Sequence, residues 1–367
     1  MKTVFLGRYN QSENLTGPEK VAKRIFKIHS EKYSSVFIEY FFDGNQFGFL
    51  KKLFGSEIPN REKNPLVKRK GIISLFIFLI FYKPDIIHII NFERFAIAGI
   101  LYKFISNAKI VYSVHGIVIH ENTNFRKTDE KLYGRDKKTE EWFFRYSDRF
   151  FVLSPQSLKI VLSYYSISDK KIRMIPNGID EEFSELYKTR KRTAYKPEIS
   201  FIVSGNIQRP EKGIDRIKDV LSRVDFPNRL FYFGPFNQKI TERSMGLKTM
   251  NLNIFGDLLI NSDIVISASV YEPFSLFTVE AMACGVVPVV SEETGMSRYI
   301  EHGMNGFIVD MNDAEKLEEI LNRLNSDREL LSSLSGNAAN IYRELNWENV
   351  YNEYERVYLK LTEKKPD

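Results

Sequence analysis

The feature that most constrains the fold is a rhythm of short apolar runs, each followed by a polar or amphipathic stretch long enough for a helix. The rhythm fills the first half of the chain, pauses, and restarts with "ISFIVSG" at 199–205. Buried strands that alternate with helices form parallel sheets with right-handed crossovers. Two such series predict an α/β chain with two Rossmann-like, doubly wound parallel-sheet domains.

The apolar runs define the strands that we expect. In the first half they are 3–7, 35–42, 85–90, 109–114, 149–154 and 171–175; in the second half they are 199–205, 229–234, 263–269, 286–290 and 306–310. Stretches of helical length between them include 18–30, 93–106 and 136–147. The run "GIISLFIFLIFY" at 71–82 is too short to span a membrane and suits either a buried core helix or an interfacial one.

A change in composition marks the domain boundary. Between 176 and 198, proline, glycine and a charge-rich segment interrupt the strand rhythm. We therefore predict an N-terminal domain over 1–178 and a second domain over 179–345. A terminal helix over 346–367 has a stripe of apolar and aromatic residues that needs a surface to cover. A chain of 367 residues is long enough for two hydrophobic cores.

The charge is divided unevenly between the two halves. Residues 1–178 contain 30 Lys or Arg and 17 Asp or Glu, whereas residues 179–367 contain 23 and 30. A basic half favours an anionic partner, such as a membrane surface, a phosphorylated substrate or nucleic acid; two domains with different solvated faces explain it equally well. A single cysteine, Cys284, excludes an internal disulfide framework and suits a reducing compartment. The N-terminus lacks the pattern of a signal peptide.

The segment "EPFSLFTVEAMACG" (272–285) follows a predicted strand and combines two carboxylates with an apolar helix. Glu272 precedes the helix, Ser275 is its expected N-cap, and Glu280 lies inside it. A helix N-terminus attracts phosphate. Carboxylates on either side of it could bind the hydroxyl groups that flank a diphosphate, as in a nucleotide sugar. The alternative is a structural role, in which Glu272 caps backbone amides and Glu280 is a solvated helix position. The apolar neighbours of Glu280 disfavour a solvated position, and an unpaired buried carboxylate is costly.

A second segment, "SGNIQRPEKGID" (204–215), follows the first strand of the second domain. Gly205 and Gly213 permit tight backbone turns, and Arg209 and Lys212 place two cations beside them. The alternative is an ordinary solvated loop. Together with the glutamate segment, the pattern favours a phosphate site that includes Lys212.

Two positions in the first domain are further candidates. Gly17 opens the first helix in "NLTGPEKVAKRIF" (14–26). Either it lets the backbone approach a ligand, or the segment is a plain strand-to-helix connection. His115 ends a strand in "YSVHGI" (112–117), as a site residue or as a structural one. The five histidines have no metal-ligand spacing, and the fingerprints of dinucleotide enzymes, P-loop NTPases and α/β-hydrolases are absent from the sequence.

Taken together, these segments resemble the retaining glycosyltransferases of family 4, which have the GT-B fold. The resemblance covers most of the chain and is densest from 199 to 310. Glu272 and Glu280 match the family's E-x7-E motif, and Lys212 with Gly213 matches its phosphate loop. The family's "IPNGID" stands at 175–180, "HGMNGFIV" (302–309) matches the segment after the active-site helix, and the helix with Trp347 matches the terminal helix.

The resemblance implies a cleft between the two domains and a terminal helix that crosses back to the first. It implies that Glu280 binds the ribose, that Lys212 neutralises the diphosphate and that His115 lies near the transferred sugar. It implies that Glu272 contacts the donor sugar together with the backbone amides of Phe274, Ser275 and Leu276. Such enzymes retain the anomeric configuration, need no metal or other cofactor, and let the departing diphosphate take the acceptor's proton as the acceptor attacks from the same face.

Three positions depart from the family's pattern. Asn206 stands where arginine usually follows the glycine at Gly205, and we hypothesise that Arg209 supplies the missing charge. Arg298 stands where glutamate is common, and the glycine pair of the first domain is reduced to Gly17.

We therefore expect a retaining glycosyltransferase that moves a sugar from a UDP- or GDP-sugar to a polysaccharide precursor or a lipid-linked glycan. It would act in the cytoplasm, at the inner face of the membrane, with peripheral association to anionic lipid. The alternatives are a sugar-nucleotide epimerase or phosphorylase on the same fold, and a non-catalytic sugar-nucleotide-binding subunit. Nucleic acid is not an expected partner, because no nucleic-acid-binding module is visible.

Overall fold

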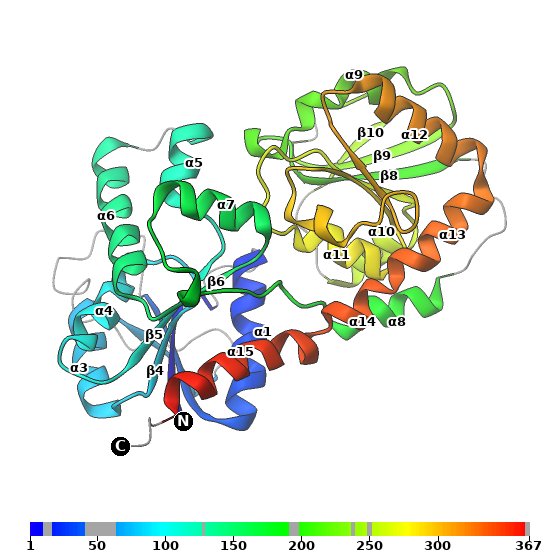
Figure 1. Cartoon of the computed structure of the whole chain (residues 1–367). Coiled ribbons are helices and arrows are strands. Elements are labelled where there is room, and N and C mark those ends of the chain that lie inside the picture. Colours follow the sequence, from blue (N-terminus) through cyan, green and yellow to red (C-terminus); the bar gives the residue numbers. More distant parts are fainter. Residues whose placement is uncertain are drawn as a thin grey trace. The chain divides into compact units, whose positions relative to one another are not determined.

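The computed structural model describes residues 1–9, 17–40, 64–126, 129–190, 198–235, 239–247 and 252–363. The chain divides into two compact units (Figure 1). The first unit comprises Met1–Pro176 together with Val350–Asp367, and the second comprises Asn177–Asn349. Each unit contains an all-parallel sheet flanked by helices, so the predicted pair of Rossmann-like domains is confirmed.

The sheet of the first unit has seven strands in the order β3-β2-β1-β4-β5-β6-β7. Their bounds are β1 (Lys2–Gly7), β2 (Ser34–Tyr40), β3 (Val67–Lys70), β4 (Ile86–Ile89), β5 (Lys109–Val114), β6 (Arg149–Val152) and β7 (Ile172–Met174). Six of them were predicted from their apolar runs; positions 41 and 42 of one predicted strand lie outside the described residues. The strand β3, "VKRK", was not predicted, because three of its four side chains are basic and it lies at the edge of the sheet.

Helices cover both faces of this sheet. They are α1 (Gly17–Lys32), α3 (Ile72–Tyr82), α4 (Ile97–Lys103), α5 (Val118–Asn124), α6 (Glu130–Tyr146) and α7 (Pro155–Tyr164), with 3-10 turns at Arg94–Ala96 and Asp169–Lys171. Alternate strand residues point to opposite faces. Val4 and Leu6 accordingly share a core with residues of α3, α4 and α6, whereas the ring of Phe5 packs edge-on against Phe26 of α1, 5.6 Å between centroids.

The sheet of the second unit has six strands in the order β10-β9-β8-β11-β12-β13. Their bounds are β8 (Ile199–Asn206), β9 (Asn228–Phe233), β10 (Ser244–Leu247), β11 (Ile264–Ser267), β12 (Val287–Ser291) and β13 (Phe307–Val309). All but β10 were predicted. The strand β10, "SMGL", is short, contains glycine and lies at the sheet edge, so it lacks the apolar signature of a buried strand.

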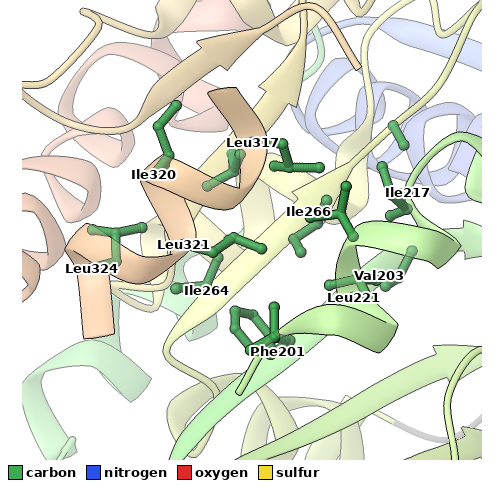
Figure 2. Close-up of a cluster of buried hydrophobic side chains, with 14 of the residues drawn as sticks. Phe201, Val203, Ile217, Leu221, Ile264, Ile266, Leu317, Ile320, Leu321 and Leu324 are labelled. Carbon is green, nitrogen blue, oxygen red and sulfur yellow. The ribbon is translucent and has the colours of Figure 1, made fainter. Parts of the chain in front are cut away.

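The helices of the second unit are α8 (Glu181–Thr189), α9 (Lys218–Arg223), α10 (Leu252–Ile260), α11 (Leu276–Ala283), α12 (Ala314–Ser326), α13 (Arg328–Ala339) and α14 (Ile341–Leu345), with 3-10 turns at Pro210–Lys212, Ile214–Arg216 and Gly295–Tyr299. Figure 2 shows part of the core. Leu317, Leu321 and Leu324 of α12 repeat at helical spacing and share one buried cluster with Phe201 and Ile264 of the sheet.

The predicted terminal helix is α15 (Trp347–Thr362), and from Val350 onward it belongs to the first unit. It covers the face of the sheet on which α1 lies (Figure 1). The hydroxyl of Tyr351 lies 2.7 Å from Nδ1 of His29, and the hydroxyl of Tyr358 lies 2.7 Å from Nδ1 of His88. The apolar stripe of the tail is therefore buried, and two histidines meet its tyrosines.

The apolar run at 71–82 forms α3. Leu75 and Leu79 are buried, but the side of the helix that includes Phe81 is exposed. Among the described residues, no helix has the length and hydropathy that crossing a membrane requires.

Candidate functional site

Two loops of the second unit meet at the carboxyl edge of its sheet. One follows β8 and includes the 3-10 turn Pro210–Lys212, and the other follows the neighbouring strand β11 and leads into α11. The backbone N–H groups of Val270 and Tyr271 donate to the carbonyl oxygen of Glu211, at 3.0 and 3.4 Å. Backbone hydrogen bonds thus join the two sequence segments that were predicted to form one site.

Lys212 and Glu272 form an ion pair between these loops. Their side chains are only 12% and 15% exposed, so water screens the pair weakly. The stem of Lys212 lies on Gly205, where a Cβ atom would stand 2.6 Å from Cδ of the lysine. Gly205 and Gly213 have φ angles of 106° and 60°, and a Cβ on Gly213 would collide with the carbonyl oxygen of Ala268. The two glycines are therefore what lets the lysine and its loop lie so close to β8 and β11.

The loop after β11 ends in a left-handed residue at the start of α11. Ser275 has a φ of 73°, which is unusual for a residue with a side chain. Its Oγ accepts a hydrogen bond from the N–H of Thr278 at 3.4 Å and lies 2.8 Å from Oγ1 of Thr278, so Ser275 is the N-cap, as predicted from its position. The turn places the first helical turn, which begins at Leu276, directly after the ion pair.

Phe274 and Glu280 are both buried. Phe274 is 1% exposed, and its ring packs edge-on against Tyr299 at 6.2 Å between centroids. Glu280 is 5% exposed, so it is not a solvated helix position. A buried carboxylate can also accept hydrogen bonds from the hydroxyl groups of a ligand.

A third loop, which follows β12, completes the edge. The N–H of Gly295 donates to the carbonyl oxygen of Glu272 at 2.8 Å, and Thr294 pairs with Glu272 in an isolated β-bridge. The hydroxyls of Thr294 and of Ser269 are buried without a hydrogen-bond partner among the described residues. Neither residue was predicted as a site residue. The only signal in the sequence was position, because Ser269 ends one predicted strand and Thr294 closely follows another.

Arg209 has a partner of its own. Its Nε and Nη2 lie 2.8 and 2.5 Å from Oε1 of Glu211, and its side chain is 48% exposed. The structure therefore brings Arg209 into the same turn as Lys212 but directs its guanidinium to Glu211. Of the other departures from the family's pattern, Asn206 accepts a hydrogen bond from the N–H of Gln208 at 2.9 Å, and the guanidinium of Arg298 lies 5.9 Å from the ring of Tyr299.

The remaining two candidates, His115 and Gly17, belong to the first unit. His115 follows β5, and its Nε2 is buried without a partner among the described residues. Burial lowers the pKa of His115 to about 4, against a smaller effect from its hydrogen bond to the backbone of Ile90. The imidazole is neutral at pH 7, and its free nitrogen can accept a hydrogen bond from a ligand. Gly17 is the first residue of α1.

The segment after His115 is held by a residue that the sequence did not single out. The carboxylate of Glu140 accepts hydrogen bonds from the N–H groups of Val118 and Ile119, at 2.7 and 3.3 Å, and from the hydroxyl of Tyr165 at 2.7 Å. Burial raises the pKa of Glu140 to about 7 in spite of these donors. In the sequence Glu140 is one of many charged residues in an amphipathic helix, and nothing there distinguishes it.

Within the part of the chain that the structure describes, no group of His, Cys, Asp or Glu side chains could hold a metal ion.

Two family models match the chain. The model described as Glycosyl transferases group 1 matches residues 247–341, which include the turn of α11 and both glutamates. The model described as Glycosyltransferase Family 4 matches residues 52–183, most of which belong to the first unit. The chain belongs to the family 4 glycosyltransferases. It is a glycosyltransferase of the hexosyltransferase type, as the motifs predicted.

Relatives with assigned activities are similar over most of their length. The UDP-Gal:alpha-D-GlcNAc-diphosphoundecaprenol alpha-1,3-galactosyltransferase of Escherichia coli is 24% identical over 74% of either chain. The N-acetyl-alpha-D-glucosaminyl L-malate synthase of Bacillus anthracis is 24% identical over 75% of this chain and 74% of its own.

Solved structures share the fold. The sucrose-phosphate synthase of Thermosynechococcus elongatus superposes with a TM-score of 0.75 over 98% of both chains at 15% identity. HepE of Anabaena, solved in complex with UDP-glucose, superposes with a TM-score of 0.73 over 98% of this chain and all of its own at 17% identity. The predicted GT-B fold class is thereby confirmed.

Proposed function

We propose that this glycosyltransferase transfers a hexose from a nucleotide-diphosphate sugar, UDP- or GDP-linked, to a polysaccharide precursor or a lipid-linked glycan, with retention of configuration and without a metal ion. The observation that carries the proposal is the Lys212–Glu272 pair directly before the N-terminus of α11, with the buried Glu280 inside that helix. A cation, a helix N-terminus and two carboxylates suit a diphosphate flanked by hydroxyl groups.

The pair suggests how binding and catalysis are linked. A diphosphate that reaches Lys212 competes with Glu272 for the ammonium group, which frees the carboxylate of Glu272 to accept hydroxyl groups of the donor sugar. In the reaction the bond from the anomeric carbon to the diphosphate oxygen breaks, and the bond to the acceptor oxygen forms on the same face. The departing diphosphate takes the acceptor's proton. Lys212 and the amides at 274–276 stabilise the charge that develops on it.

Glu280 is assigned to the ribose. Its carboxylate is held in a buried position inside α11 and would accept hydrogen bonds from the two vicinal hydroxyls. His115, neutral and with a free Nε2, would accept a hydrogen bond from the transferred sugar.

For the acceptor, the proposal rests on a relative and on charge. The Escherichia coli relative is named for an acceptor linked to diphosphoundecaprenol. The basic first half of this chain suits an anionic acceptor or an anionic membrane. We therefore place the reaction in the cytoplasm, at the inner face of the membrane.

The test is thermal unfolding with UDP, GDP, ADP, CMP and dTDP, for the wild type and for Glu280→Ala. A ligand that binds only the native state stabilises it by about 2.7 kcal/mol at a hundredfold excess over its Kd. We expect one diphosphate to raise the melting temperature of the wild type and to lose this effect in Glu280→Ala. The control is Glu242→Ala in the same unit, since Glu242 has a side chain 95% exposed. If no nucleotide stabilises the folded wild type, the proposed site is wrong.

Product analysis separates the alternative chemistries. A nucleotide-sugar donor incubated alone, in the presence of EDTA, is converted by an epimerase but not by a metal-independent transferase that requires an acceptor. With the acceptor present, the anomeric coupling constant of the product reports retention. Binding of the nucleotide without any transfer to lipid-linked acceptors would instead support the non-catalytic subunit.

A further inference from the structure

Glycosyl transfer leaves one surface of the first unit unexplained. Helix α3 carries no charged residue along its eleven positions, yet it is only partly covered. Ile77, Ile80 and Phe81 are 45%, 39% and 81% exposed. Their spacing of three and four residues puts them on one face of the helix. An exposed helix face ordinarily carries polar or charged side chains, so this face indicates contact with something other than water.

Helix α4 and the two residues after it continue this surface. Leu101, Phe104 and Ile105 are 41%, 58% and 64% exposed, at the same helical spacing. Each helix leads from the carboxyl end of one strand to the amino end of another in an all-parallel sheet, so the two helices point the same way and both rows lie near their C-terminal ends. The helices pack against each other and lie side by side in Figure 1. The surface therefore spans both.

Aromatic contacts extend this surface to α6. The ring of Phe104 packs edge-on against Tyr146 at 5.1 Å, and Trp142 packs against the same tyrosine at 5.4 Å. Trp142 is itself 39% exposed. We call the following set the apolar surface: Ile77, Ile80, Phe81, Leu101, Phe104, Ile105 and Trp142. A contiguous patch of this kind is uncommon on a surface that faces only water.

Basic side chains flank the apolar surface where it lies on α3. Residues 64–109 include seven Lys or Arg and two Asp or Glu; of the seven, Arg69, Arg94 and Lys103 form ion pairs with carboxylates. Lys68 and Lys70 lie with Nζ 5.4 and 5.2 Å from the ring centre of Phe78 on α3, and the guanidinium of Arg145 lies 5.5 Å from the ring of Tyr146. Lys83 follows α3 directly and is exposed. Apolar and aromatic side chains within a basic rim are the composition that binds the headgroup region of anionic membranes.

We propose that the apolar surface docks the protein on an anionic lipid bilayer, with α3 and α4 lying in the plane of the interface. A second copy of the chain is a poorer occupant, because a two-fold contact would bring the basic rims together. Docking deepens the proposed function by giving the enzyme access to a lipid-linked acceptor. Only this purpose rests on the proposed function; the docking surface itself is inferred from exposure and charge. Because both exposed rows lie toward the amino ends of the strands, docking leaves the carboxyl ends uncovered.

The experiment is binding of the full chain to phosphatidylcholine vesicles with and without phosphatidylglycerol, measured by flotation. The chain has two tryptophans, and Trp347 is buried, so a vesicle-induced blue shift of the emission reports Trp142. We expect binding to the anionic vesicles, weakened by salt, with that blue shift. Trp142→Phe should remove the shift and keep most of the binding.

The decisive variant is Phe81→Ser with Phe104→Ser, two side chains exposed enough for the substitution to leave the fold intact. It should weaken vesicle binding at least about tenfold. The matched control replaces two exposed apolar residues of the second unit, Met245→Ser with Met304→Ser, which are 58% and 59% exposed. The control should bind as the wild type does.

Three results would overturn the inference: no vesicle binding by the wild type, equal binding by the Phe81/Phe104 variant, or concentration-dependent dimerisation that this variant abolishes, which would make a second copy the occupant. Nucleotide stabilisation is measured on the same proteins. If it persists while vesicle binding fails, only the docking surface is wrong; if it is absent while vesicles bind, the proposed function is wrong instead.

Discussion

The buried histidine His29 predicts an acid sensitivity of the first unit that a single substitution should reduce. His29 lies between α15 and β1, with Nδ1 2.7 Å from the hydroxyl of Tyr351 and Nε2 3.0 Å from Oγ1 of Thr3. Burial, aided by the nearby charges of the N-terminus and Lys32, lowers the pKa of His29 to about 3. The unfolded chain binds a proton there near pH 6.5, so the unfolded state takes up more protons than the folded one as the pH falls.

The magnitude follows from this difference in proton binding. Stability is fully present above the unfolded pKa and decreases from about pH 6.5 down toward about 3. Between pH 7 and pH 5 the loss from His29 alone is about 2 kcal/mol. His88 and His115 act in the same direction, because burial lowers their pKa values too, whereas Glu140 acts in the opposite direction because burial raises its pKa. The substitution His29→Gln isolates one group from this sum.

The assay is urea unfolding at pH 7 and pH 5 in a Trp347→Phe background, where Trp142 reports the first unit alone. We expect the loss of unfolding free energy between the two pH values to be about 2 kcal/mol smaller in His29→Gln than in the parent. The control is His302→Gln in the second unit. Equal pH dependence of His29→Gln and its parent would mean that His29 binds its proton in the folded protein, and the account of its burial would be refuted.

Three further substitutions test the geometry of the site and of the terminal helix. Gly205→Ala should destabilise the second unit by about 1–3 kcal/mol and weaken nucleotide binding, because a left-handed residue gains a Cβ that displaces Lys212; urea unfolding and calorimetry measure both. Ser275→Gly should have a free energy of unfolding about 1 kcal/mol higher than Ser275→Ala, measured by urea unfolding, since both lose the cap but only alanine keeps the left-handed strain. The reverse order would contradict the assigned backbone strain. Tyr358→Phe should cost the first unit about 1 kcal/mol through loss of the hydrogen bond to His88, and an unchanged unfolding midpoint would count against that bond.

The sequence alone determined the architecture and located the two segments that the structure joins around Lys212 and Glu272. Short apolar runs are local consequences of which side chains must leave water, so they located eleven of the strands. The loops at the carboxyl ends of the strands followed from the parallel topology. Lys212 and Glu272 lie 60 positions apart, but both follow neighbouring parallel strands, so the topology was enough to predict that they would meet.

The tertiary structure decided which polar groups have partners and which apolar groups have none. The pairing of Arg209 with Glu211, the three hydrogen bonds to Glu140 and the exposure of Phe81 leave no local signature, because each depends on neighbours supplied by other turns and other helices. The edge strands β3 and β10 escaped prediction because their own side chains lack an apolar run: β3 is mostly basic and β10 is short and contains glycine. The edge strands β7 and β13 have apolar runs and were predicted. Burial and pairing are properties of the assembled fold, so the local sequence pattern cannot predict them.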